Sequence, residues 1–105
     1  MESAVPTPVV FCGLPCSAEL ARYREAPGQI AIRLRSLEDG EPVACATVAL
    51  PDFALEPGHV LIKDYSENTG MLAALLASGL VRDTGQRVRS GYVLLPICEL
   101  RVPAP

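Results

Sequence analysis

The sequence has no tryptophan, one lysine (Lys63) and one histidine (His59) among its 105 residues. Aromatic residues make up 5% and hydrophobic residues 50%, so the core must be built from aliphatic side chains. Nine basic residues face twelve acidic ones, a formal net charge of −3. Proteins that bind nucleic acid directly normally carry a basic excess, because they neutralise phosphates. This charge balance argues against direct nucleic-acid binding and favours a protein partner.

Membrane and export signals are also missing from the sequence. No apolar run reaches the roughly 18 residues that a membrane-spanning helix needs. Met1-Glu2-Ser3 places an acidic residue where a signal peptide carries positive charge. We therefore expect a cytoplasmic protein without a membrane role. The length and composition predict one globular domain, 1–105, with loose proline-containing termini at 1–8 and 101–105.

Signatures of catalysis and metal binding are lacking as well. There is no glycine-rich phosphate loop, no H-E-x-x-H and no G-x-S-x-G. Only Cys12 and Cys16 are closely spaced, and a structural zinc site needs four ligands. A reducing cytosol disfavours a disulfide between these two. Cys45 and Cys98 lie in apolar runs and are expected to be buried. We expect no metal and no cofactor.

Period-two alternation of apolar residues predicts a β-hairpin in the first half of the chain. Ile30, Ile32 and Leu34 form one apolar face, Asp39-Gly40 forms the turn, and the return strand covers Val43–Leu50. Residues 18–24 are predicted to form a further strand, with a short helix from Ser17 as the alternative.

A strand, a helix and a last strand are predicted in the second half. The strand is His59–Lys63, and Ser66 is the expected N-cap of a helix that ends at Gly79. Its apolar face is expected to pack on the hairpin face of Ile30, Ile32 and Leu34, and consists of Met71, Leu72, Leu75 and Leu76.

A turn at 83–85 leads to the last strand, 92–100, where Pro96 favours an edge strand or a bulge. These elements predict an α+β fold, a mostly antiparallel sheet of four to five strands with one helix packed on one face.

Two groups of polar residues are candidate contact sites. The first is the junction between the predicted strand and helix, residues 62–71, which concentrates polar side chains beyond what one helix cap needs. The second is a small basic cluster of Arg82, Arg87 and Arg89, whose alternative role is pairing with Asp83 or Glu99 on a solvated face. The predicted partner-binding residues are Asp64, Tyr65, Glu67, Asn68, Arg87 and Arg89.

Three stretches of the chain resemble an uncharacterised bacterial family carried on phages, plasmids and conjugative elements. They are residues 46–51, the motif Ile62–Met71, and residues 77–93, within a match that covers about 28–100. The most specific part is Lys63–Met71, in which Thr69 stands where the family pattern has an acid. The family has no established catalytic residues, so the resemblance implies a mobile-element setting and no enzymatic role.

Two functions from different classes follow. The first is a small non-enzymatic interaction protein that inhibits a bacterial defence system of the CRISPR or restriction type by binding a protein complex that handles nucleic acid. The alternative is a small enzyme or ligand-binding domain that uses His59, Asp64 and a cysteine. The sequence does not indicate an oligomeric state.

Overall fold

The computed structural model describes residues 8–103 and 105, so the expected loose arm at 1–8 lies outside the described residues except for Pro8. It has an α+β fold with seven strands in two antiparallel sheets, more than the four to five expected. The first sheet has the order β1-β2-β3-β4. Its strands are β1 (Val9–Phe11), β2 (Leu14–Arg22), β3 (Ile30–Ser36) and β4 (Pro42–Cys45).

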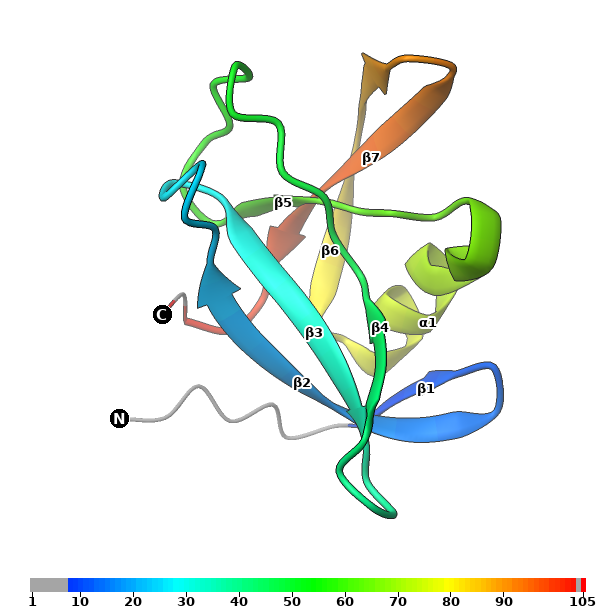
Figure 1. Cartoon of the computed structure of the whole chain (residues 1–105). Coiled ribbons are helices and arrows are strands. Elements are labelled where there is room, and N and C mark those ends of the chain that lie inside the picture. The colour runs from blue at the N-terminus through cyan, green and yellow to red at the C-terminus, as the bar shows by residue number, and fades with distance from the viewer. Residues whose placement is uncertain (1–7, 104) are drawn as a thin grey trace.

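The first sheet grows by consecutive hairpins (Figure 1). β1 and β2 are joined by Cys12 and Gly13, which both have positive φ, as a two-residue type I′ turn requires. This turn explains the Cys12–Cys16 spacing, since it leaves Cys12 exposed and directs Cys16 into the core. The strand prediction for 18–24 is confirmed up to Arg22, and the helix alternative is wrong.

The second sheet has the order β5-β7-β6, with β5 (His59–Leu61), β6 (Val81–Ser90) and β7 (Val93–Leu100). The predicted turn at 83–85 is instead a bulge inside β6, where Gly85 has a φ of 84° and the register shifts between Asp83 and Gln86. β7 is the central strand, so Pro96 is not at an edge. The proline is tolerated because β5 ends opposite Ile97, and the Pro96 carbonyl accepts the Ile62 N–H at 3.0 Å.

An isolated antiparallel bridge, Thr47 to Ile62, joins the segments that follow β4 and β5, and the Lys63 N–H donates to the Ala46 carbonyl beside it at 2.8 Å. The predicted strand 43–50 ends early at Cys45, and the chain beyond it crosses between the sheets. There the Thr47 hydroxyl accepts the Ile32 N–H at 3.1 Å and is hydrogen bonded to the Tyr23 hydroxyl at 2.9 Å. A side-chain hydroxyl therefore takes the place of a main-chain acceptor. We call this contact between the two sheets, at Thr47 and Ile62, the seam.

The helix α1 (Met71–Ser78) follows a short 3-10 turn, η1 (Ser66–Asn68), and lies against β1 and β6 (Figure 1). Met71 and Leu75 are fully buried in the main core cluster, which also contains Ile30, Ile32 and Leu34. Leu76 is 39% exposed, so its predicted place on the buried face is wrong. Gly79 ends the helix with a φ of 79°, as predicted.

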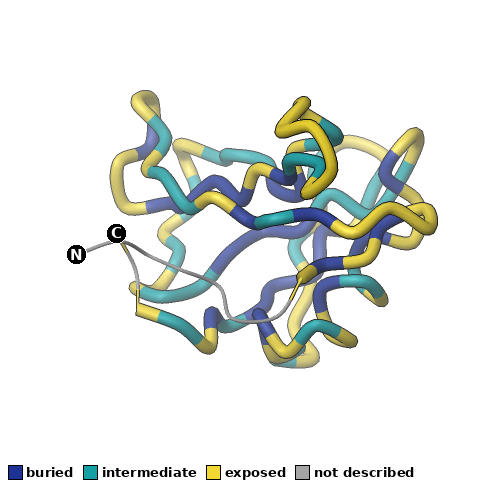
Figure 2. Tube along the Cα trace, turned by 90° about the horizontal axis from the view of Figure 1, so that it is seen from below, coloured by how far each residue is buried: buried dark blue, intermediate teal, exposed yellow. Residues whose placement is uncertain are grey.

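Burial follows the two sheets and leaves the turns at the surface (Figure 2). A second, smaller core cluster of Leu61, Leu95 and Ile97 lies on the other face of β7. The predicted burial of Cys98 is confirmed, whereas Cys45 is exposed at the end of edge strand β4. In residues 8–103, no helix is long and apolar enough to cross a membrane.

Candidate functional site: the junction, the hairpin end and a pocket

The junction owes its polar character to its role in the fold. Asp64 Oδ1 accepts hydrogen bonds from the N–H groups of Gly70 at 3.0 Å and Leu72 at 3.1 Å. Asp64 therefore caps α1, and the predicted cap Ser66 does not: its φ is 59° and it begins the 3-10 turn. The Asp64 side chain is half-buried. Each of its two hydrogen bonds satisfies a backbone N–H at the start of the helix, where these groups have no partner within the helix.

Asn68 is the most buried polar residue of the junction, with an exposed fraction of 1%. Its Nδ2 donates to the Cys45 carbonyl at 2.6 Å and thereby fixes the 3-10 turn to the end of β4. A side chain buried to this degree has no surface to offer a partner. The contact role predicted for Asn68 is replaced by a structural one.

Lys63, Tyr65 and Glu67 form the solvent-facing side of the junction. Lys63 Nζ lies 2.6 Å from Glu67 Oε2 and 5.6 Å from the centre of the Tyr65 ring. The hydrogen bond between Lys63 and Glu67 raises the pKa of the lysine and lowers the pKa of the glutamate. The Glu67 side chain is 68% exposed, and Tyr65 packs against the second core cluster. Of the four predicted junction contacts, Glu67 is exposed, Asp64 and Tyr65 are half-buried, and Asn68 is buried.

The two predicted arginines lie on β6 and share one face, as expected for residues two apart in a strand. Arg87 forms a two-pronged pair with Asp83, at 3.0 and 3.1 Å, and this pair lowers the pKa of Asp83. Arg82 pairs with Glu99 at 2.8 Å. Pairing with Asp83 and Glu99 is confirmed for Arg87 and Arg82, whereas Arg89 is exposed and forms no ion pair with the described residues.

The end of the β6–β7 hairpin exposes apolar residues that the sequence reasoning missed. Gly91 and Tyr92 form its two-residue turn, and Tyr92 is fully exposed. Leu94 is 56% exposed and pairs across the strands with Arg89, which places both on one face. We call Arg87, Arg89, Tyr92 and Leu94 the hairpin end. In Figure 1 the turn between β6 and β7 stands at the top of the molecule, at the same end as the loop that precedes β5.

A second exposed apolar set lies on the β1–β2 and β3–β4 hairpins, at the opposite side of the molecule in Figure 1. Val10 is 55% exposed and pairs with Pro15, whose carbonyl accepts the Leu37 N–H. Leu37 is 54% exposed. This set lacks aromatic residues, the type that protein interfaces favour.

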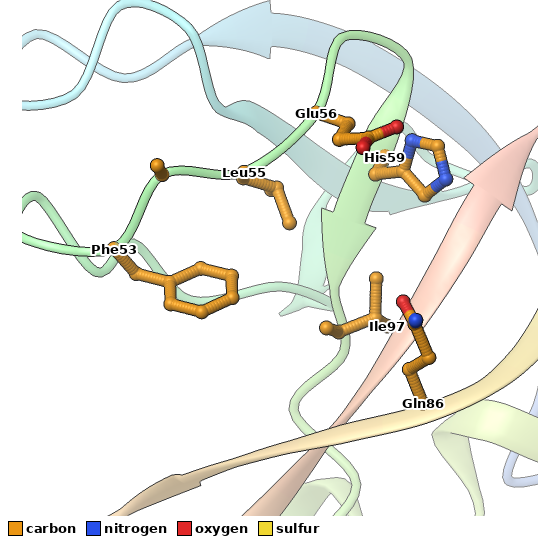
Figure 3. Close-up of a pocket in the computed structure, with 7 residues that line it drawn as sticks. Phe53, Leu55, Glu56, His59, Gln86 and Ile97 are labelled. Atoms are coloured by element: carbon orange, nitrogen blue, oxygen red, sulfur yellow. The ribbon is translucent and has the colours of Figure 1, made fainter.

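His59 lines a pocket of about 280 Å³ between the 53–56 loop and the second sheet. Glu56 and Gln86 extend toward His59 from two sides, while Phe53 and Leu55 form the wall along the loop (Figure 3). Neither Asp64 nor a cysteine lines this pocket. The structure therefore does not bring together His59, Asp64 and a thiol, the groups of the alternative enzymatic hypothesis.

The four cysteines are free thiols at separate places in the fold. Burial raises the pKa of the Cys98 thiol to about 12. Among residues 8–103, no three side chains of the metal-binding types gather into a cluster. The arrangement offers neither an activated thiolate nor a set of metal ligands.

Comparisons of this chain with protein-family models, curated proteins and solved structures gave no match. Inferences about function therefore depend on the geometry of these three regions and on the resemblance of the Ile62–Met71 motif.

Proposed function

We propose that this chain is a small interaction protein that acts in the cytoplasm by binding a protein partner through the hairpin end. The observation that supports this most directly is a fully exposed tyrosine beside a 56% exposed leucine at the tip of the β6–β7 hairpin. Tyrosine and arginine are enriched at the energetically dominant positions of protein interfaces. Tyr65 packs against the cluster that contains Leu95, on the other face of this hairpin from Arg89 and Leu94, so the proposed contact surface consists of the hairpin end alone.

The partner class follows from the resemblance and from charge. Proteins on mobile elements benefit from inhibiting bacterial defence, and a defence complex that handles nucleic acid is the partner we propose. The chain as a whole carries a net charge of −3, which suits competition for a basic surface. Arg89 would meet an acidic group at the edge of that surface, and charge complementarity of this kind raises association rates.

The test is capture from lysate of a bacterial host by tagged protein, identification of the bound proteins by mass spectrometry, and measurement of affinity for the purified candidate. A Tyr92→Ser, Leu94→Ser double variant should lose most of the affinity, since truncating an interface hot spot costs about 2 kcal/mol or more. A Val10→Ser, Leu37→Ser variant removes similar apolar groups from the other exposed set and should bind as the wild type does.

Inhibition of the defence system in cells should follow the same ranking of variants, and binding should weaken as salt rises. Equal affinity of the folded hairpin variant and the wild type would remove the hairpin end as the contact surface. A partner outside bacterial defence would overturn the inhibitor proposal and leave the binding surface intact.

A further inference from the structure

The pocket beside His59 is independent of the hairpin end and is prepared for a ligand of definite chemistry. Its wall is held in place by Gln29, which is buried and lies on the neighbouring sheet's side of the loop. Gln29 Nε2 donates to the carbonyls of Leu50 at 2.7 Å and Phe53 at 3.1 Å, while its Oε1 accepts the Leu50 N–H at 2.8 Å. Three hydrogen bonds from one side chain fix this turn, so the loop wall is formed before any ligand binds.

The polar side chains at the pocket offer several acceptors, and Gln86 offers an amide donor as well. The Nδ1 of His59 lies 3.1 Å from the Pro57 carbonyl. A carbonyl only accepts, so Nδ1 carries a hydrogen, and in the tautomer with this single hydrogen Nε2 is an acceptor. Glu56 contributes a carboxylate and Gln86 an amide oxygen, and within residues 8–103 neither side chain has a hydrogen-bond partner.

The remaining lining is apolar. Phe53, Leu55 and Ile97 belong to or pack against the second core cluster, and they form a hydrophobic wall beside the acceptors. Glu99, cross-strand neighbour of His59, is held by Arg82, so Glu56 is the pocket's own unpaired charge. A volume of about 280 Å³ suits a compact ligand or the end of a peptide chain.

We infer that this pocket binds a primary ammonium group attached to a short apolar body. An ammonium carries three donors and one positive charge, and it matches a carboxylate, an imidazole nitrogen and an amide oxygen. The apolar body lies against Phe53 and Leu55. The chemistry fits either a free alkyl or arylalkyl amine or the N-terminus of a peptide that begins with a hydrophobic residue.

The experiment is a titration of ¹⁵N-labelled protein followed by amide chemical shifts. 2-Phenylethylamine should shift the amides of residues 53–56, 58, 59 and 86, and should bind at least tenfold more tightly than N-acetyl-2-phenylethylamine or 3-phenylpropionate. Leucylglycinamide with a free or acetylated amino group forms the second arm. Tighter binding of the free peptide identifies a chain N-terminus as the source, and tighter binding of the amine identifies a small amine; both support the ammonium site.

Glu56→Gln should weaken amine binding at least tenfold, whereas Glu38→Gln removes an exposed carboxylate from the distant β3–β4 turn and should leave the affinity unchanged. Glu56 is exposed, so the variant should keep the wild-type spectrum outside the pocket. Equal binding of amine and carboxylate, no shifts at the pocket, or unchanged affinity in Glu56→Gln overturns the inference.

Discussion

The junction and the hairpin end differ in which side chains they bury. The junction turns polar groups inward, whereas the hairpin end exposes apolar side chains. At the junction, Asp64 and Asn68 direct their polar groups onto backbone amides and a backbone carbonyl. At the hairpin end, Tyr92 and Leu94 direct apolar surface into solvent. The polar groups of the junction therefore stabilise the fold, whereas the exposed apolar side chains of the hairpin end do not contribute to the core. Polar density in a sequence indicates a contact surface only if the fold does not use those groups.

The helix that the junction positions gives the largest expected effect. Leu75 is fully buried, and Leu75→Ala should lower the free energy of unfolding by about 2–5 kcal/mol. Leu76→Ala, one residue along the same helix, is the matched control and should cost much less because its side chain is 39% exposed. Urea denaturation of both variants measures the difference. Equal losses would show that α1 is not seated as described.

Asn68 tests directly whether the junction is structural. Asn68→Ala removes a buried side chain and its hydrogen bond to the Cys45 carbonyl, and should cost about 1–3 kcal/mol. Thr69→Val is the control, since it removes an exposed hydroxyl bond on the same segment and should stay within about 0.5 kcal/mol. Thermal unfolding followed by circular dichroism gives both values. A loss below 0.5 kcal/mol for Asn68→Ala would return this residue to the candidate contacts.

Asp64 should show a smaller loss, because it is only half-buried. Asp64→Ala removes the bonds to the Gly70 and Leu72 amides and should cost about 1 kcal/mol, the usual value of a helix cap. Glu67→Ala, in the same segment, should leave stability nearly unchanged. If Glu67→Ala proved the more destabilising, the division between structural and exposed junction residues would be incorrect.

Cys98 and Leu94 lie on the same face of β7, but Cys98 is buried and Leu94 is exposed. Burial raises the pKa of Cys98 from 9.0 to about 12. Well below pH 9 the thiol is protonated in both the folded and the unfolded state, so its burial contributes fully to the free energy of unfolding. As the pH rises toward 12, the unfolded state ionises first and stability falls, by up to about 1.4 kcal/mol at pH 10.

Unfolding at a series of pH values from 8 to 11 measures this loss. Cys98→Ala should flatten part of the decline, while exposed Cys12→Ala should keep the wild-type slope. Some decline remains in either variant, because burial also raises the pKa of Tyr23 to about 12. An unchanged slope in Cys98→Ala would contradict the burial of this thiol.

The hairpin end should show the smallest effect on stability. Tyr92→Ser and Leu94→Ser remove side chains that make little contact with the core, so the free energy of unfolding should change by less than about 0.5 kcal/mol. Denaturation alongside the affinity measurement completes the contrast with Asn68. A large destabilisation would mean that the tip supports the fold and would remove the reason to regard it as a contact surface.

Sequence reasoning succeeded where a residue acts locally. The alternation of Ile30, Ile32 and Leu34 predicted a strand, and the glycine at position 79 predicted the end of the helix. It failed where distant segments decide the outcome. Gly85 has the positive φ of a turn residue, but pairing with β7 absorbs it into a bulge, and no local signal distinguishes the two.

The candidate site was less predictable for the same reason. Asn68 is buried because Cys45, far away in the sequence, presents a carbonyl to it. Tyr92 is exposed because it lies in the two-residue turn at the tip of the β6–β7 hairpin. An aromatic residue next to the turn glycine Gly91 was a usable signal. No local sequence signal pointed to Gln29 or Glu56, because only the folded structure shows that Gln29 holds the loop in place and that Glu56 lies close to His59.

The isolated bridge between Thr47 and Ile62 also bears on the order in which the molecule assembles. β1–β4 and the β6–β7 pair are hairpins of neighbouring strands, which close short loops and form quickly. The seam requires instead that β5 find β7 and that Thr47 reach Ile32, both across long stretches of chain. Two preformed halves then dock late and through few main-chain bonds. Formation of the seam is therefore expected to limit the folding rate. Once formed, the seam opens only at a high cost in free energy, because the main core cluster draws buried residues from both sheets.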